Sequence, residues 1–123
     1  MRHMRPPILL VILLAFCIAA PALAADRMAF WNLTSATITR LTMAPAGTGT
    51  FGPDQCANDR DGIVDHDERL RLTGIEPGRY DVQLATQPPP PKPGVTCTIR
   101  NVEVKGGGKY AFSLADGDLT DCK

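Results

Sequence analysis

The residues best suited to chemistry lie in one acidic segment, residues 57–68. Set against the EF-hand calcium loop, Gly62 falls at position 6, where that loop makes its sharp turn. Four carboxylates fall at ligand positions of the loop: Asp59, Asp61, Asp65 and Glu68. Oxygen ligands of this kind are the ones that calcium prefers. Calcium binding by this segment is therefore one function that the sequence predicts.

Two features oppose a complete EF-hand. Position 1 is Ala57, so the leading carboxylate is absent, and the flank that should form the entering helix is rich in glycine and contains Pro53. Glu68 opens a strand pattern and not a helix. The alternative is a solvated acidic loop, without a cofactor, in which Asp59 and Asp61 serve as turn residues.

A catalytic function is not predicted. His66 lies between Asp65 and Asp67, and Ser35 or Ser113 could be nominated as its nucleophile. The chain has no G-x-S-x-G turn, however, and a histidine between two acids in a polar loop is usually just exposed. A domain of this size also has little room for a cleft that holds paired carboxylates. We therefore expect a protein that is not an enzyme.

The first residues have the pattern of a cleaved export signal. Two arginines form a positive start, residues 8–20 form an apolar run, and residues 22–24 form an A-x-A cleavage site. The apolar run is shorter than the roughly 18–20 residues that span a bilayer. We expect a signal peptide over residues 1–24, and a mature periplasmic or secreted domain over residues 25–123 with no membrane span.

The charge balance limits the partners. Of 13 basic and 13 acidic residues, the leader carries two arginines and no acid, so the mature chain is slightly acidic. This balance predicts no electrostatic binding of nucleic acid or of anionic lipid. The balance is compatible with two kinds of partner, an envelope protein or a small ligand.

Three cysteines remain in the mature chain, and in an oxidising compartment two of them should pair. Cys97 alternates with Val95 and Ile99, so its thiol faces the core, and Cys122 closely follows the last strand-like run. We predict a Cys97–Cys122 disulfide, which leaves Cys56 as a free thiol in a loop. A third candidate role is redox partnership, in which Cys56 forms a disulfide with a partner molecule. No two cysteines have the C-x-x-C spacing of a metal site.

The mature chain alternates strands with turns, because proline and glycine interrupt every stretch long enough for a helix. Residues 28–33 and 37–43 are rich in aromatic and β-branched residues and predict one hairpin. Residues 68–73 and 80–84 alternate apolar with polar positions and predict a second hairpin, with both arginines of the first run pointing outward.

The remaining strands come after a proline-rich linker, residues 87–94. Residues 95–104 form a long strand whose inward parity switches at Arg100-Asn101, which predicts a β-bulge. Residues 109–114 form the last strand. Each strand has one apolar face, so two sheets must pack together. We predict a single antiparallel β-sandwich of about six to seven strands with a Greek-key-like order.

A tight turn carries a structural motif at Pro77, Gly78 and Tyr80. A tyrosine just after such a turn fits the tyrosine corner of Greek-key sandwiches, in which the hydroxyl bonds back to the backbone. The segment also resembles the L-x-P-G-x-Y turn of prealbumin-like and immunoglobulin-like modules. Its expected role is structural.

Several short motifs follow one another along the mature chain: Phe30-Trp31-Asn32, Met43 to Gly47, Phe51 to Asp54, Pro77 to Asp81, and Cys97 near Asn101-Val102. In this order they resemble small exported β proteins of unknown function from Gram-negative bacteria, particularly alphaproteobacteria. Phe51 stands where those proteins have a tryptophan, and Ala44 where a serine is common. The resemblance implies a periplasmic β domain and no activity. We predict a non-enzymatic binding or envelope-associated module, with a calcium-binding domain as the alternative.

Overall fold

The computed structural model describes residues 28–123, and this part of the chain is all-β, as predicted. Its strands are β1 Ala29–Leu33, β2 Thr37–Pro45, β3 Arg69–Arg71, β4 Gly78–Gln87, β5 Val95–Val104 and β6 Phe112–Ala115. Two short 3-10 helices, η1 Gln55–Asn58 and η2 Asp116–Asp118, lie between strands or after them. The predicted signal segment, residues 1–24, lies outside the described residues. Within them no helix is long and apolar enough to cross a membrane.

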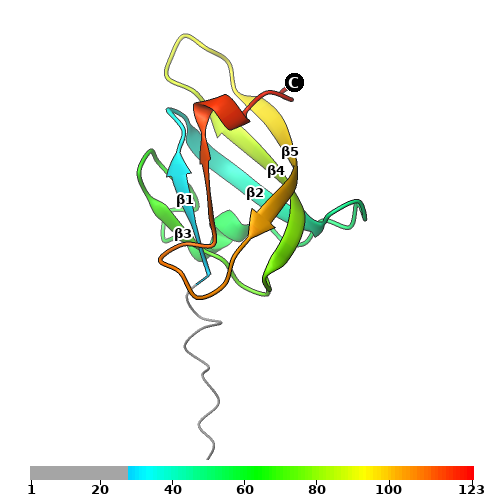
Figure 1. Ribbon diagram of the computed structural model, residues 1–123. Coiled ribbons are helices and arrows are strands. Elements are labelled where there is room, and N and C mark those ends of the chain that lie inside the picture. Colours follow the sequence, from blue (N-terminus) through cyan, green and yellow to red (C-terminus); the bar gives the residue numbers. More distant parts are fainter. Residues whose placement is uncertain (1–27) are drawn as a thin grey trace, which may run out of the picture.

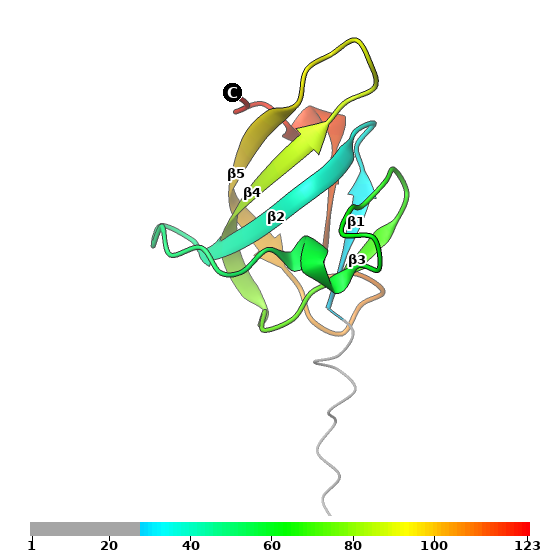
Figure 2. The ribbon, with the colours of Figure 1, turned by 180° about the vertical axis from the view of Figure 1, so that it is seen from behind.

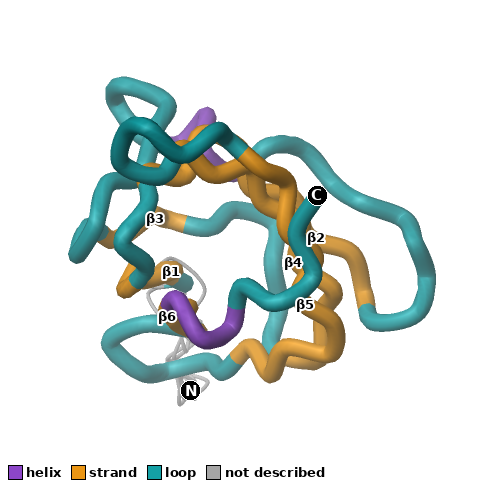
Figure 3. The backbone as a smooth tube through the Cα atoms, turned by 90° about the horizontal axis from the view of Figure 1, so that it is seen from above, coloured by secondary structure: helices purple, strands orange, loops and turns teal. Residues whose placement is uncertain are grey.

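The six strands form two sheets of three (Figure 1). One sheet has the order β3-β1-β6 and the other the order β2-β4-β5. Seen from above, the two sheets lie on opposite sides of the molecule (Figure 3). The helix η1 contacts both β2 and β3, so it bridges the two sheets along one side (Figure 2).

One apolar core fills the space between the sheets. Its centre on the first sheet is an aromatic pair, Phe30 and Phe112, with ring centroids 4.9 Å apart. The fully buried aliphatic side chains around this pair come from both sheets and from the loop before β3: Ile38, Leu41, Val64, Leu70, Val82, Leu84 and Val104. Alternation assigned one face of each strand to packing, and Tyr80, Val95, Ile99 and Val102 of that set are half-buried. It predicted the inward-facing residues correctly except at Tyr110, which is exposed.

Both predicted hairpins are wrong. β1 pairs with β3 and β6, whereas β2 pairs with β4, so each predicted hairpin has its two strands in different sheets. The physical reason is that alternation specifies the face of a strand and says nothing about its partner. The observed hairpin is β4 with β5, joined across the proline-rich loop 88–94.

The prediction of purely antiparallel sheets is also wrong at one pair. β1 and β6 are parallel, in a register that places Phe30 opposite Phe112 and Leu33 opposite Ala115. A parallel pair needs a long connection, and here most of the chain runs between the two strands. The described residues therefore form two sheets that are mainly antiparallel.

The bulge predicted in β5 is confirmed. Tyr80 pairs with Val102 and Val82 pairs with Ile99, so Asp81 of β4 stands opposite the two residues Arg100 and Asn101. Asn101 takes a left-handed backbone with φ of 58°. Asp81 as a residue is 6% exposed, and its carboxylate accepts hydrogen bonds from the backbone N–H groups of Asn101 at 3.0 Å and Gly47 at 3.1 Å. Asp81 thus holds the bulge against the loop after β2.

The crossing from the first sheet to the second depends on Asn32, which is fully buried. Its Nδ2 donates to the carbonyl oxygens of Ala36 and Val64, both at 3.0 Å. Its Oδ1 accepts from the backbone N–H of Thr34 at 3.0 Å and from the Thr34 hydroxyl at 2.7 Å. The Asn32 side chain therefore fixes the turn between β1 and β2 and ties it to the segment before β3.

We expect Asn32→Ala to lower the free energy of unfolding by about 3 kcal/mol, because it removes four hydrogen bonds of a buried amide and leaves the backbone N–H of Thr34 without an acceptor. Urea unfolding followed by circular dichroism measures this loss. Thr39→Ala, which removes an exposed polar side chain from the neighbouring strand, is the control and should stay within about 0.5 kcal/mol. Equal unfolding midpoints for the two variants would contradict the role of Asn32.

Acid should destabilise the domain partly through Asp81. The backbone N–H of Asn101, followed by that of Gly47, holds the pKa of Asp81 below its ordinary value of 3.8. A carboxyl whose pKa is lower in the folded state stabilises it above the unfolded pKa, and this contribution is lost as pH falls through the folded pKa. Asp81→Asn should therefore lower the melting temperature at pH 7 and flatten its decline below pH of about 4. Glu103→Gln, an exposed control in β5, should leave the profile unchanged.

Candidate functional site

The outer face of the β3-β1-β6 sheet carries an aromatic and cationic cluster. Within β1 burial alternates, so that Phe30 and Asn32 are buried while Trp31 points outward and is half-buried. The register places Trp31 opposite Arg69 of β3 and Ser113 of β6. Side chains directly opposite each other on one face of a sheet are close enough to touch. The pairing of the strands therefore creates this cluster.

Three side chains form a stack on this face. The Arg69 guanidinium lies over the Trp31 ring, with Cζ 4.5 Å from the ring centroid. Tyr110, just before β6, packs on Trp31 with ring centroids 5.1 Å apart and planes tilted by 53°. Trp31 Nε1 donates to Asp67 Oδ1 at 2.9 Å, which fixes the indole in its plane. Tyr110 is 38% exposed and is the one large hydrophobic residue of the described chain that is exposed.

Next to the stack lies an open hollow of about 750 Å³. It is lined by Met28, Ala29, Arg69, Arg71, Gly107, Gly108 and Lys109. Ala29 stands opposite Arg71 in the β1–β3 register, two residues before Trp31 on the same face. Its small side chain therefore leaves space between the arginines of β3 and the glycine turn before β6. The face offers cations, exposed aromatic surface and a concave floor in one place.

The acidic loop is held mainly by hydrogen bonds from its own backbone N–H groups to its own carboxylates. Asp59 Oδ1 accepts from the N–H of Asp61, and Asp61 Oδ1 accepts from the N–H of Ile63, as residues of successive tight turns do. A side-chain hydrogen bond with Asp59, followed by the bond from the Ile63 N–H, lowers the pKa of Asp61. Each of these two carboxylates thus already serves the turn in which it lies.

The other two predicted calcium ligands have different partners. Asp65 Oδ1 accepts from the Thr37 hydroxyl at 2.8 Å, and Glu68 Oε2 accepts from the N–H of Asp65 at 3.1 Å. Among residues 28–123 no three His, Cys, Asp or Glu side chains gather closely enough to hold a metal ion. Glu68 immediately precedes β3, as its strand pattern indicated. Calcium binding by Asp59, Asp61, Asp65 and Glu68 stays a prediction.

The side chains nominated for catalysis are engaged separately. His66 Nδ1 lies 2.8 Å from the carbonyl oxygen of Thr34. The Ser35 hydroxyl donates to Asp116 Oδ1 at 3.1 Å, and the Ser35 N–H donates to the same oxygen. Ser113 is placed on the outer face opposite Trp31. These contacts fasten the turn after β1 to the loop before β3 and to η2.

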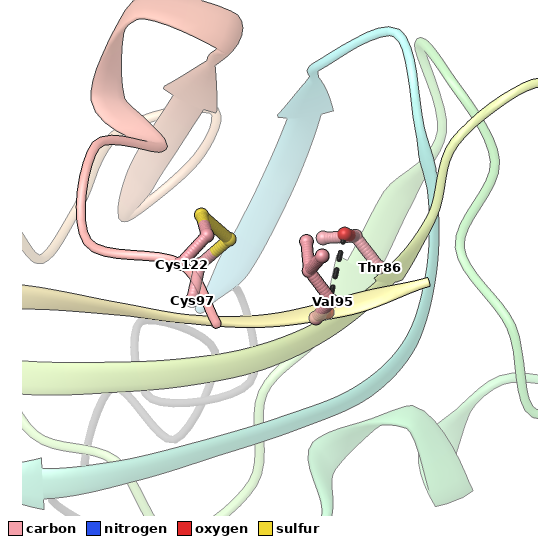
Figure 4. Close-up of a disulfide and its surroundings, with 4 residues drawn as sticks. All are labelled: Thr86, Val95, Cys97 and Cys122. Carbon is pink, nitrogen blue, oxygen red and sulfur yellow. Dashed lines mark hydrogen bonds between the residues drawn. A yellow bond between two sulfur atoms is a disulfide. The ribbon is translucent and has the colours of Figure 1, made fainter. Parts of the chain in front are cut away.

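The predicted Cys97–Cys122 disulfide is present (Figure 4). Cys97 is fully buried, as the alternation in its strand indicated. Around the disulfide the C-terminal segment 120–123 runs antiparallel along β5, where Thr96 and Lys123 exchange two backbone hydrogen bonds of 3.0 and 2.9 Å. The disulfide therefore fastens this segment to the outer edge of β5.

Cys56 is free, as predicted, but it lies in a short helix and not in a loop. It lies in η1 and is fully buried, with Sγ 3.9 Å from the carbonyl oxygen of Ile38. Burial is the main cause that raises its pKa to about 12, and the nearby Asp54 carboxylate adds to the shift. The reactive form of a cysteine is its thiolate, so this environment opposes redox partnership through Cys56.

The tyrosine corner has the predicted geometry. The Tyr80 hydroxyl donates to the carbonyl oxygen of Glu76 at 2.8 Å and accepts from the N–H of the same residue at 3.3 Å. Pro77 and Gly78 make the turn between these two positions, and β4 begins at Gly78. The corner joins β3 to β4 across the two sheets.

Comparison with protein-family models, curated proteins and solved structures finds no match for this chain. Sequence reasoning placed Arg69 and Arg71 on an outer face but did not connect them with Trp31 or Tyr110. The available signal was the alternation of Phe30, Trp31 and Asn32, which requires an exposed tryptophan. The cluster appears only once β1 is known to pair with β3.

Replacing both disulfide cysteines by serine should lower the free energy of unfolding by about 3.5 kcal/mol, because the bond closes a loop with a sequence separation of 25 residues. Urea unfolding of the double variant against the oxidised parent gives this value. Hydrogen exchange should show the segment 120–123 losing protection first. A mass spectrum of the unreduced protein that links Cys56 to Cys97 would contradict the assignment.

Proposed function

We propose that this chain is an exported, non-enzymatic binding module of the cell envelope. Its mature form is a single Greek-key-like β-sandwich over residues 25–123, released by cleavage after Ala24 and located in the periplasm or secreted. The pattern of the leader supports export, and so does the Cys97–Cys122 disulfide, since such bonds persist in oxidising compartments. The resemblance to small exported proteins of Gram-negative bacteria agrees with this location.

The single observation that carries the binding role is the stack of Arg69, Trp31 and Tyr110 on the outer face of the β3-β1-β6 sheet. Tryptophan, tyrosine and arginine are the residues most enriched at the energetic centres of interfaces. Here they lie together outside the core, where packing within the domain does not require them. The hollow over Ala29 adds a concave surface beside them. We name this surface, made of Ala29, Trp31, Arg69, Lys109 and Tyr110, the tryptophan face.

Sedimentation with isolated cell envelope tests this role. The full-length chain, expressed with its own leader and recovered after export, should sediment with the envelope fraction. Arg69→Ala and Tyr110→Ala should each weaken this binding about tenfold, because each removes a contact at the centre of the face. Arg40→Ala is the matched control, since Arg40 is an exposed arginine of β2 on the other sheet.

Three results would overturn the proposal: a protein that keeps its leader in the cytoplasm, no binding to the envelope, or equal loss of binding in the Arg40 and Arg69 variants. Calcium titration in the same preparation tests the alternative. A ligand that binds only the folded state must raise the melting temperature, so a rise that Asp61→Asn abolishes would establish the calcium site instead.

A further inference from the structure

The charged residues that line the hollow beside the tryptophan face are basic. Among the described residues that line it, Arg69, Arg71 and Lys109 are basic and none is acidic. This local excess differs from the slightly acidic balance of the mature chain. A concave surface lined by one sign of charge concentrates the field and attracts ions of the opposite sign. The lining therefore selects for an anionic ligand.

Arg69 is held in place before any ligand arrives. Its guanidinium lies over the Trp31 ring, and the ring is fixed in turn by the bond from Nε1 to Asp67. A guanidinium presents N–H donors in a planar fork that matches the two oxygens of a carboxylate or phosphate. Because Arg69 is already ordered, less side-chain freedom is lost when an oxyanion binds.

The dimensions of the hollow suit a small organic molecule. Its volume of about 750 Å³ falls within the range of small-ligand sites, which is roughly 300–1,000 Å³. Ala29 contributes only a methyl group to the lining, and Gly107 and Gly108 contribute no side chains. Met28 and Ala29 supply the apolar part of the lining, against which the body of a ligand can lie.

We propose that the hollow over Ala29 binds an organic oxyanion of sugar size. Its carboxylate or phosphate group pairs with Arg69 and Lys109, and its ring lies over Ala29. This inference rests on the proposed binding function and names the class of ligand for the same face. The shared chemistry is the oxyanion, and acidic sugars and sugar phosphates are its two sources in the envelope.

Calorimetric titration of the full-length chain with three matched sugars tests the ligand class. Glucuronate carries a carboxylate, glucose 6-phosphate carries a phosphate, and glucose carries neither. We expect at least one charged sugar to bind about tenfold more tightly than glucose, because a charge-assisted pair contributes that much to affinity. The one that binds more tightly identifies the source. Equal affinities for all three sugars would overturn the proposal.

Variants test the location. Arg69→Gln should weaken binding of the charged sugar about tenfold by removing the positive charge, and Ala29→Leu should do so by filling the floor without any change of charge. Lys109→Gln, in an exposed turn, serves if the Ala29 variant does not fold. Arg40→Gln, on the other sheet, is the control and should bind within about twofold of the parent. Circular dichroism melting confirms that each variant is folded.

The result separates this inference from the function on which it rests. If envelope binding requires Arg69 but no charged sugar binds or competes, the ligand class is wrong and the binding face stands. If a charged sugar binds equally to the parent and to the Arg69 and Ala29 variants, the hollow is the wrong place. If envelope binding does not depend on the tryptophan face, the proposed function itself fails.

Discussion

The fold depends on one buried polar side chain that has all of its hydrogen bonds made. Asn32 uses both donors and accepts twice, and every partner lies in the turn after β1 or at Val64 before β3. A buried amide without these partners would oppose folding, so only a chain path that supplies all of them is stable. That path takes the chain from one sheet to the other directly after β1. The same burial leaves no room for a glycan at Asn32, although Asn32-Leu33-Thr34 matches the glycosylation sequon.

Asp81 applies the same principle on the other sheet. Its carboxylate accepts from the β5 bulge on one side and from the loop after β2 on the other. Both polar residues act at points where the regular ladder is interrupted and where apolar packing alone would allow several arrangements. In this small domain the apolar core supplies the driving force, whereas buried polar groups select one arrangement of the strands.

The sequence was sufficient for the features that local periodicity encodes and insufficient for those that depend on strand partners. The alternation in β5 identified Cys97 as inward, its parity switch located the bulge at Asn101, and the P-G-x-Y spacing located the corner at Tyr80. The two hairpins failed because adjacent strands were taken as partners, whereas the Asn32 contacts and the Tyr80 corner carry the chain across the core. The cluster of Trp31 and Arg69 could not be predicted for the same reason. The two residues are distant in sequence and meet only through the β1–β3 register.

The attachment of segment 120–123 to β5 has a consequence for the behaviour of the domain before oxidation. β5 is the outermost strand of its sheet. On the side of β5 that faces away from β4, this segment forms hydrogen bonds with the backbone groups of Thr96 and Thr98. An edge strand with open backbone groups is a template on which another chain can pair and aggregate. Formation of the Cys97–Cys122 bond covers this edge, so oxidation protects the folded domain from self-association as well as stabilising it.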